Sequence, residues 1–167
     1  MLVALRDGGH GAEVLLTRRS MSLRTHRGEI SFPGGRADPG ETYEQAALRE
    51  AHEEVALPPS SIDLVGRLHP LSTVVSLSFI VPVVGVMRDA PELRAAVAEV
   101  DRILWVSLAD LATDGTFREE RWGAPPLDRP VFFFDLDDET VWGATARVLH
   151  QLLRVAHRLE GPEPQAL

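Results

Sequence analysis

The chain has 167 residues, 44% of them hydrophobic and 25% charged, which is enough to bury the core of one soluble domain. Its formal net charge of −8 argues against general binding to nucleic acid, and the absence of Cys and Lys excludes disulfides, thiolate metal sites and Schiff-base chemistry. No apolar run is long enough to span a bilayer and the first residues do not resemble a secretory signal, so we expect a cytoplasmic location without membrane contact.

The first elements alternate strands with glycine-rich turns and end in a long helix. Strands are predicted at Val3–Arg6, Glu13–Thr17 and Glu29–Phe32, the last of them running into a Pro-Gly-Gly turn. The helix is predicted from Thr42 to Val55, because one of its faces is apolar and two prolines follow its end.

The rest of the chain is mainly β-like until its last helix. Strands are predicted at Ile62–Val75, Leu77–Met87, Ile103–Val106, Thr116–Trp122 and Val131–Leu136. Ser107–Leu111 is predicted as a helical turn, because Ser107 is a good N-cap residue. The second long helix is predicted from Thr140 to Leu159, with an apolar stripe of Val141, Ala144, Val148, Leu152, Val155 and Leu159. This order predicts a mixed sheet covered by two main helices.

Three carboxylates of the first helix carry the main chemical signal. Glu50, Glu53 and Glu54 are spaced i, i+3 and i+4, which places them on one side of the helix, where like charges repel. A hard divalent cation such as Mg²⁺ or Mn²⁺ relieves this repulsion and keeps water ligands for a phosphate substrate. The alternative is a solvated acidic helix face. The spacing favours metal-assisted chemistry on phosphates.

A basic segment lies upstream, against the acidic balance of the whole chain. It contains no acidic residue between its first and last cation, and its cationic residues are Arg18, Arg19, Arg24, His26 and Arg27. Guanidinium groups suit phosphate oxygens, so we expect the segment to bind substrate phosphates. The alternative is that each of these cations is solvated or pairs with a carboxylate.

A motif that includes the acidic helix resembles the Nudix box. The matching residues are Gly35, Glu41, Arg49, Glu50, Ala51, Glu53, Glu54 and Leu57. Ala56 stands where the family usually has Gly, a residue that suits a left-handed helix exit, so we expect the exit to shift slightly. The resemblance implies a single Nudix hydrolase domain spanning residues 1–167, folded as an α/β/α sandwich with a mixed sheet.

The segment before the box resembles the signature of the coenzyme A pyrophosphatase branch of this family. The matching residues are Leu15, Leu16, Thr17, Arg19, Ser20, Arg24, Gly28, Phe32, Pro33, Gly34 and Gly35. Val141–Ala146 is similar to the segment that opens the last helix in that branch. A structural explanation of the same segment is a core position for Trp142 and close helix packing at Gly143.

The resemblance also implies roles for the residues of the box. Glu50 and Glu54 are the expected direct ligands of Mg²⁺ or Mn²⁺, Glu53 is a ligand or the base that orients the attacking water, and the Gly35 carbonyl adds a ligand. Arg49 is expected to orient the carboxylates.

Glu41 and a later carboxylate complete the expected site. Glu41 either binds metal through water or acts as a charge near the helix N-terminus. Glu99 is the carboxylate expected from a later loop, with Asp101, Glu119 and Glu120 left open. Of the histidines, His52 is expected to be exposed, and contact between His26 and phosphate stays open.

We therefore expect hydrolysis of coenzyme A or its thioesters to adenosine 3′,5′-bisphosphate and 4′-phosphopantetheine. The alternatives are a Nudix hydrolase for ADP-ribose, NADH or a dinucleoside polyphosphate, and a non-catalytic module that binds a nucleotide. The expected partner is a small-molecule substrate. Trp122–Pro130 either lines the channel for the pantetheine arm or forms a surface loop. The oligomeric state and the acyl-chain preference are not readable from the sequence.

Overall fold

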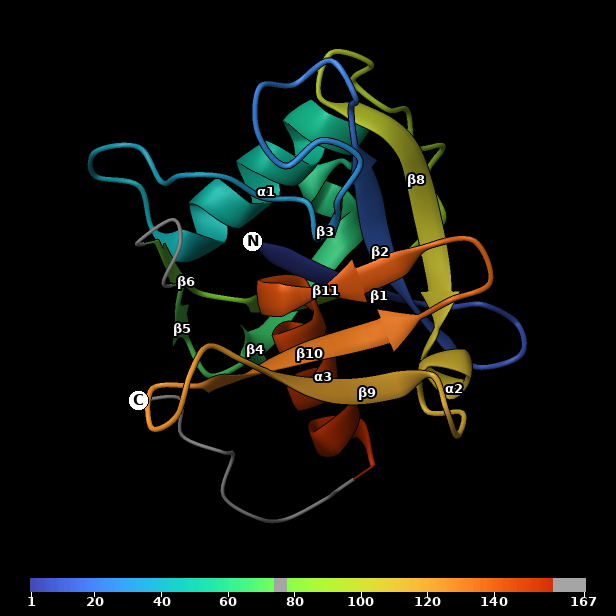
Figure 1. Ribbon diagram of the computed structural model, residues 1–167. Helices are drawn as coiled ribbons and strands as arrows, with labels where there is room; N and C mark the ends of the chain where they lie inside the picture. Colours follow the sequence, from blue (N-terminus) through green and yellow to red (C-terminus); the bar gives the residue numbers. More distant parts are fainter. Residues whose placement is uncertain (74–77, 158–167) are drawn as a thin grey trace.

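A mixed sheet forms the centre of the molecule (Figure 1). The computed structural model describes residues 1–73 and 78–157. The sheet contains β1 (Leu2–Asp7), β2 (Ala12–Arg19), β3 (Ile30–Ser31), β4 (Ile62–Arg67), β7 (Val83–Met87) and β8 (Val100–Ser107). Its order is β3-β2-β1-β7-β4, with β8 also paired to β2; β1 and β7 are parallel and the other pairs are antiparallel.

Strand β2 has an unusual arrangement of neighbours. Strand β8 pairs with β2 along almost the whole length of β2, so β8 occupies one side of that strand within the sheet. On the other side, β1 pairs with the first half of β2 and β3 with the second half. The end of β3 therefore points toward the start of β1, and Leu2 N donates to the Pro33 carbonyl at 2.8 Å.

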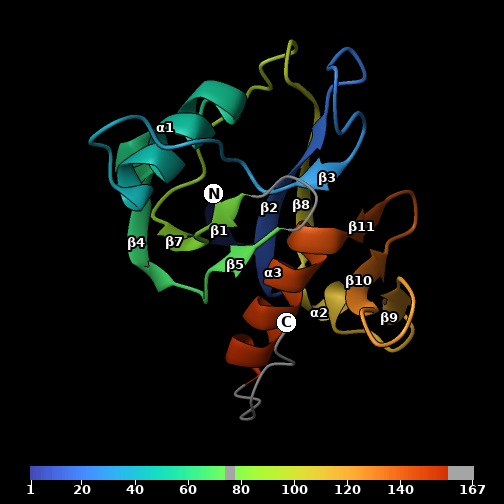
Figure 2. The ribbon, with the colours of Figure 1, turned by 60° about the vertical axis from the view of Figure 1, so that its left-hand side comes forward.

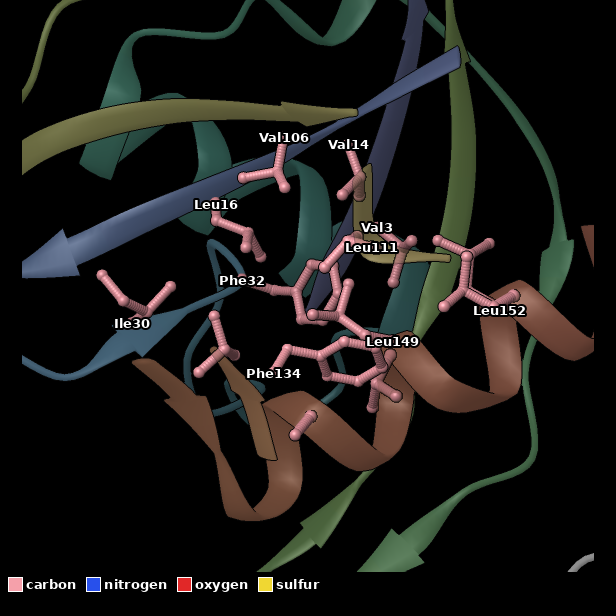
Figure 3. Packing of buried hydrophobic residues seen from close by; sticks show 14 of the residues in the cluster. Val3, Val14, Leu16, Ile30, Phe32, Val106, Leu111, Phe134, Leu149 and Leu152 are labelled. Carbon is pink, nitrogen blue, oxygen red and sulfur yellow. The ribbon is translucent and has the colours of Figure 1, made fainter. Parts of the chain in front are cut away.

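Two helices cover opposite faces of this sheet (Figures 1 and 2). They are α1 (Tyr43–Val55) and α3 (Gly143–Ala156). Successive residues of β1 face opposite sides, as a strand requires: Leu2 and Ala4 pack in the cluster on the α1 side, and Val3 packs in the cluster on the α3 side. Figure 3 shows this second cluster, with aromatic rings between sheet and helix. The predicted α/β/α sandwich with a mixed sheet is confirmed.

Smaller elements surround the sandwich. A three-stranded sheet contains β9 (Phe117–Trp122), β10 (Arg129–Asp135) and β11 (Thr140–Trp142), and a two-stranded sheet contains β5 (Leu71–Ser72) and β6 (Phe79–Ile80). Helix α2 (Leu108–Leu111) and the 3₁₀ turn Pro59–Ser61 complete the elements. The strands predicted at Thr116–Trp122 and Val131–Leu136 correspond to β9 and β10, which pair with each other, and the Ser107 cap is confirmed. In the described part of the chain, no helix is long and apolar enough to cross a membrane.

The prediction of two long strands at Ile62–Val75 and Leu77–Met87 was wrong. Each is interrupted: β4 ends at Arg67 before β5 begins, and β6 ends at Ile80 before β7 begins. Pro70 lies in the first gap and Pro82 in the second, and a proline has no N–H to donate to a neighbouring strand. Val75 and Leu77 lie outside the described residues.

The last helix begins later than predicted. Thr140–Trp142 forms β11 and pairs with β10, so α3 begins at Gly143. Trp142 is 39% exposed, which contradicts a core position. A Cβ on Gly143 would meet no atom within 4 Å, so glycine is not needed here for close packing. It is needed for the positive φ of +64°. Val155 of the predicted apolar stripe is exposed, and Leu159 lies outside the described residues.

Both ends of α1 are specified by local sequence. Thr42 and Gln45 form a reciprocal capping box at the N-terminus. At the C-terminus, Ala56 has φ of 56° and ψ of 29°, and its N–H bonds to the carbonyls of Ala51 and His52. Ala56 thus adopts the left-handed conformation that costs an L-residue about 1 kcal/mol.

Ala56→Gly is expected to raise the free energy of unfolding by about 1 kcal/mol, because glycine adopts this conformation without strain. Urea unfolding measures the change. The control is Ala109→Gly, at an exposed position inside α2, which should destabilise by about 0.5–1 kcal/mol. Destabilisation by both variants would contradict strain at Ala56.

Candidate active site

The Gly34-Gly35 turn lies directly against the acidic side of α1. The turn follows β3 and Pro33, and Gly34 N donates to Oε2 of Glu54 at 3.3 Å. A Cβ placed on Gly35 would lie 2.4 Å from the carboxyl carbon of Glu50. Only glycine therefore allows backbone and carboxylate to approach this closely.

The three box carboxylates have different environments. Glu53 is exposed, Glu50 is half-buried, and Glu54 is only 5% exposed. Burial raises the pKa of Glu54 to about 7; the Gly34 N–H and Arg19 act in the opposite direction, whereas Glu50 and Glu99 raise it further. Glu54 is thus a buried acid with two other acids, Glu50 and Glu99, near it.

Arg49 connects the helix to the preceding loop. Its Nε and Nη2 each lie 3.0 Å from an oxygen of Glu41, and its Nη1 donates to Glu50 at 2.9 Å and to Glu53 at 3.1 Å. Nη2 also donates to the Arg36 carbonyl at 3.1 Å. These bonds hold the pKa of the Glu41 carboxyl below its usual range. Arg49 therefore orients carboxylates on both the helix and the loop.

Glu99 is the later carboxylate that the fold brings toward this cluster. It precedes β8, its carbonyl accepts from Ser20 N at 2.8 Å, and it is near enough to Glu54 to raise the pKa of that acid. Asp101 instead accepts from Met21 N at 3.2 Å.

The other open carboxylates belong to a different part of the molecule. Glu119 and Glu120 lie on β9, and Glu120 bonds to Arg118 and to the Trp122 indole N–H.

The structure separates the five cations of the basic segment. The positive charge of Arg19 lowers the pKa of Glu54, so this guanidinium lies near the carboxylates. Its Nε is buried without a hydrogen-bond partner among the described residues. Arg18 instead pairs with Glu139 at 3.0 Å.

The remaining three cations lie in an exposed loop. Nδ1 of His26 is 2.8 Å from Glu29, and the Arg27 Nε donates to the Leu23 carbonyl at 2.5 Å. Arg24 is exposed. The loop is closed at its neck, where Arg19 N bonds to Glu29 O and Gly28 N bonds to Arg19 O, each at 3.0 Å.

The cluster fits a hard divalent cation in charge and donor type. Glu50, Glu54 and Glu99 supply oxygen donors in negative excess, and Gly35 leaves room for the Glu50 carboxylate against the backbone. Within residues 1–73 and 78–157, however, no three acidic or histidine side chains are gathered closely enough to hold a metal ion. Arg49 holds Glu50 and Glu53, so a complete ligand set requires these side chains to turn.

A pocket of about 540 Å³ adjoins the Gly34-Gly35 turn. Arg36, Tyr43 and Phe79 line it, and sequence reasoning assigned none of them to the site. Phe79 is distant in sequence and no motif marks it. The segment Trp122–Pro130 does not line this pocket; it spans the β9–β10 turn, where Leu127 is 78% exposed.

Comparison with known proteins gave consistent matches. The NUDIX domain model matches residues 1–127. An uncharacterized Nudix hydrolase, NudL of Photorhabdus laumondii, is 36% identical over 141 residues, covering 83% of this chain and 74% of that protein.

Two solved structures show the same fold. The M. smegmatis Nudix hydrolase RenU matches with a TM-score of 0.66 at 19% identity, over 98% of this chain and 87% of that one. A C. elegans Ap4A hydrolase binary complex matches with a TM-score of 0.56 at 23% identity, over 65% of this chain and 78% of that one.

Proposed function

Because the chain belongs to the Nudix family of hydrolases, we propose that it cleaves the pyrophosphate bond of coenzyme A or its thioesters. The products are adenosine 3′,5′-bisphosphate and 4′-phosphopantetheine, formed within one domain of residues 1–167. The observation that carries the proposal is the position of Arg19. Among the described residues, this buried guanidinium nitrogen has no acceptor, and its charge acts on the Glu54 carboxylate, which suits a phosphate group bound beside the carboxylate cluster.

The carboxylate cluster supplies the site of hydrolysis. When bound by Glu50, Glu54, the Gly35 carbonyl and in some states Glu53, Mg²⁺ or Mn²⁺ would offset the charge of the pyrophosphate and lower the pKa of bound water. Arg49 orients Glu50 and Glu53 through its two bonds to them. Glu53 and Glu99 are both exposed carboxylates, able to accept a proton from the attacking water.

The reaction is hydrolysis of the P–O–P bridge of the pyrophosphate. Water adds its hydroxyl group to one phosphorus, the bridging P–O bond breaks, and the bridging oxygen leaves with the other phosphate and takes the second proton. In this proposal Arg19 binds phosphate oxygens, and the exposed cations of the loop, Arg24, His26 and Arg27, bind the additional 3′-phosphate. This gives coenzyme A an advantage over substrates with only two phosphates.

A second candidate is hydrolysis of another nucleoside diphosphate derivative, such as ADP-ribose, NADH or a dinucleoside polyphosphate. The structural match to an Ap4A hydrolase favours this class of substrate. A non-catalytic nucleotide-binding module is disfavoured because every box carboxylate is present.

Product analysis with coenzyme A, dephospho-coenzyme A, ADP-ribose and NADH tests the proposal, in Mg²⁺ and again in Mn²⁺. We expect adenosine 3′,5′-bisphosphate and 4′-phosphopantetheine, formed fastest from coenzyme A. Equal rates on coenzyme A and dephospho-coenzyme A would remove the role of the 3′-phosphate. Faster cleavage of ADP-ribose or NADH would replace coenzyme A as the proposed substrate. Tight binding of a nucleotide without hydrolysis would favour the non-catalytic binding module.

A further inference from the structure

The pocket beside the Gly34-Gly35 turn has aromatic and aliphatic walls. Tyr43 comes from the first residue of α1 and Phe79 from β6, which Figure 1 shows beside that end of α1. Ala46, Ile80 and Val81 also line the pocket. Its volume of about 540 Å³ lies within the range of small-molecule sites, and it opens next to the carboxylate cluster.

Its two aromatic side chains are exposed although larger apolar groups are normally buried. Tyr43 is 43% exposed and Phe79 is 60% exposed. The guanidinium of Arg67 lies over the Tyr43 ring at 5.5 Å and also pairs with Glu44 at 2.5 Å, so the ring is supported from one side. Strand β6 is tied to β5 by the pairing of Phe79 with Ser72. Both rings therefore offer apolar surface from supported positions.

The pocket differs in charge from the basic segment. Arg36 is the one charged side chain among its lining residues, and in the described part of the chain no carboxylate pairs with its guanidinium. Arg36 directly follows Gly35, which lies against the Glu50 carboxylate, so its backbone is next to the carboxylate cluster. The basic segment, by contrast, has several exposed cations, Arg24, His26 and Arg27, and none of its residues lines the pocket.

A pyrophosphate substrate has two arms, and in coenzyme A the two arms differ in charge. The nucleotide arm carries an extra phosphate and needs cations, whereas the pantetheine arm is uncharged, with methyl groups, amides and a thiol or thioester. We propose that the pocket between Tyr43 and Phe79 binds the uncharged pantetheine or acyl-pantetheine arm, and that Phe79 is a specificity-determining residue. This rests on the proposed function and gives the pocket and the basic segment separate tasks: Arg36 contacts the phosphate that carries the pantetheine arm, and the basic segment binds the nucleotide arm.

Kinetics with Phe79→Ala test the proposal, with Trp122→Ala as the matched control. Trp122 is 49% exposed and lies in the other segment considered for the arm. We expect Phe79→Ala to raise KM for coenzyme A about tenfold with kcat within about twofold, because an apolar contact made equally in ground and transition states is lost. The ratio of rates on coenzyme A and dephospho-coenzyme A should not change. The preference among acyl-coenzyme A chain lengths should change, and Phe79→Tyr should restore KM.

Calorimetric binding of 4′-phosphopantetheine separates this proposal from the proposed function. The wild type should bind it and Phe79→Ala should bind it about tenfold more weakly. If the wild type fails to cleave coenzyme A, the proposed function fails, and this titration alone decides on the pocket. The pocket assignment would be overturned if Phe79→Ala left both KM and binding unchanged, or if Trp122→Ala alone raised KM. It would also be overturned if the wild type did not bind 4′-phosphopantetheine.

Discussion

Glu54→Gln is expected to lower kcat for coenzyme A by more than about 100-fold. Removing even a group that only hydrogen-bonds to a metal ligand lowers metal affinity or activity by about 10–100-fold, and Glu54 is assigned as a direct ligand. An amide keeps the shape of the side chain but removes the charge that binds a cation. Steady-state kinetics in Mg²⁺ measure the loss. Turnover at the wild-type level would refute the assignment of Glu54 as a ligand.

The same variant is expected to stabilise the metal-free protein at pH 8. The pKa of Glu54 is raised from its ordinary 4.5 to about 7, so the folded state binds this proton more tightly than the unfolded state. The stabilisation that this tighter proton binding gives the folded state is fully present below pH 4.5 and is lost as the pH rises to about 7. The loss is on the order of 3 kcal/mol, from about 1.4 kcal/mol per pKa unit.

Urea unfolding in EDTA at pH 5 and pH 8 measures this effect. Glu54→Gln should show less decline between the two pH values than the wild type and should be the more stable protein at pH 8. The control is Glu92→Gln, which removes an exposed carboxylate 3.6 Å from Arg94 and should change neither activity nor pH dependence. A Glu54→Gln protein less stable than the wild type at pH 8 would contradict the cost of burying this charge.

Gly35→Ala is expected to lower kcat by about 100-fold, because the new methyl group must displace the Glu50 carboxylate. The chain offers a close control in Gly8→Ala. A Cβ on Gly8 would also lie 2.4 Å from a carboxyl carbon, that of Glu13, which pairs with Arg6. Both variants meet a carboxylate at the same distance, but only Gly35→Ala should lose activity.

Kinetics and urea unfolding of the two glycine variants distinguish a chemical effect from a general loss of stability. Similar destabilisation with a large difference in kcat supports the Gly35 assignment. Equal losses of kcat in both variants would show that the glycines act through stability alone.

Local features of the sequence were sufficient to predict the acidic helix. Thr42 caps it, its apolar face packs on the sheet, and the i, i+3, i+4 spacing of the carboxylates follows from helical geometry alone. Exposure of His52 followed from the same periodicity. The strand interruptions were missed because β-propensity is summed along a run, whereas Pro70 and Pro82 act at single backbone positions.

Long-range placement could not be predicted. The basic segment offers several similar cations, and only the fold separates Arg19, near Glu54, from Arg18, which pairs with Glu139 at 3.0 Å. Phe79 reaches the pocket through β6, and no local pattern indicates that its ring remains exposed. The raised pKa of Glu54 likewise depends on burial, which a helical wheel does not measure.

The closed neck between Arg19 and Glu29 has a consequence for how such enzymes can diversify. The backbone bonds at the neck, and the pairing of β3 with β2, fix where the chain leaves and re-enters the sheet. Residues 21–27, which lie between these bonds, can therefore change in length or composition without moving Gly35 or α1. A loop transplanted from a relative onto this neck would carry its own recognition chemistry to an unaltered hydrolytic centre, so the neck is a natural junction for building chimaeric enzymes.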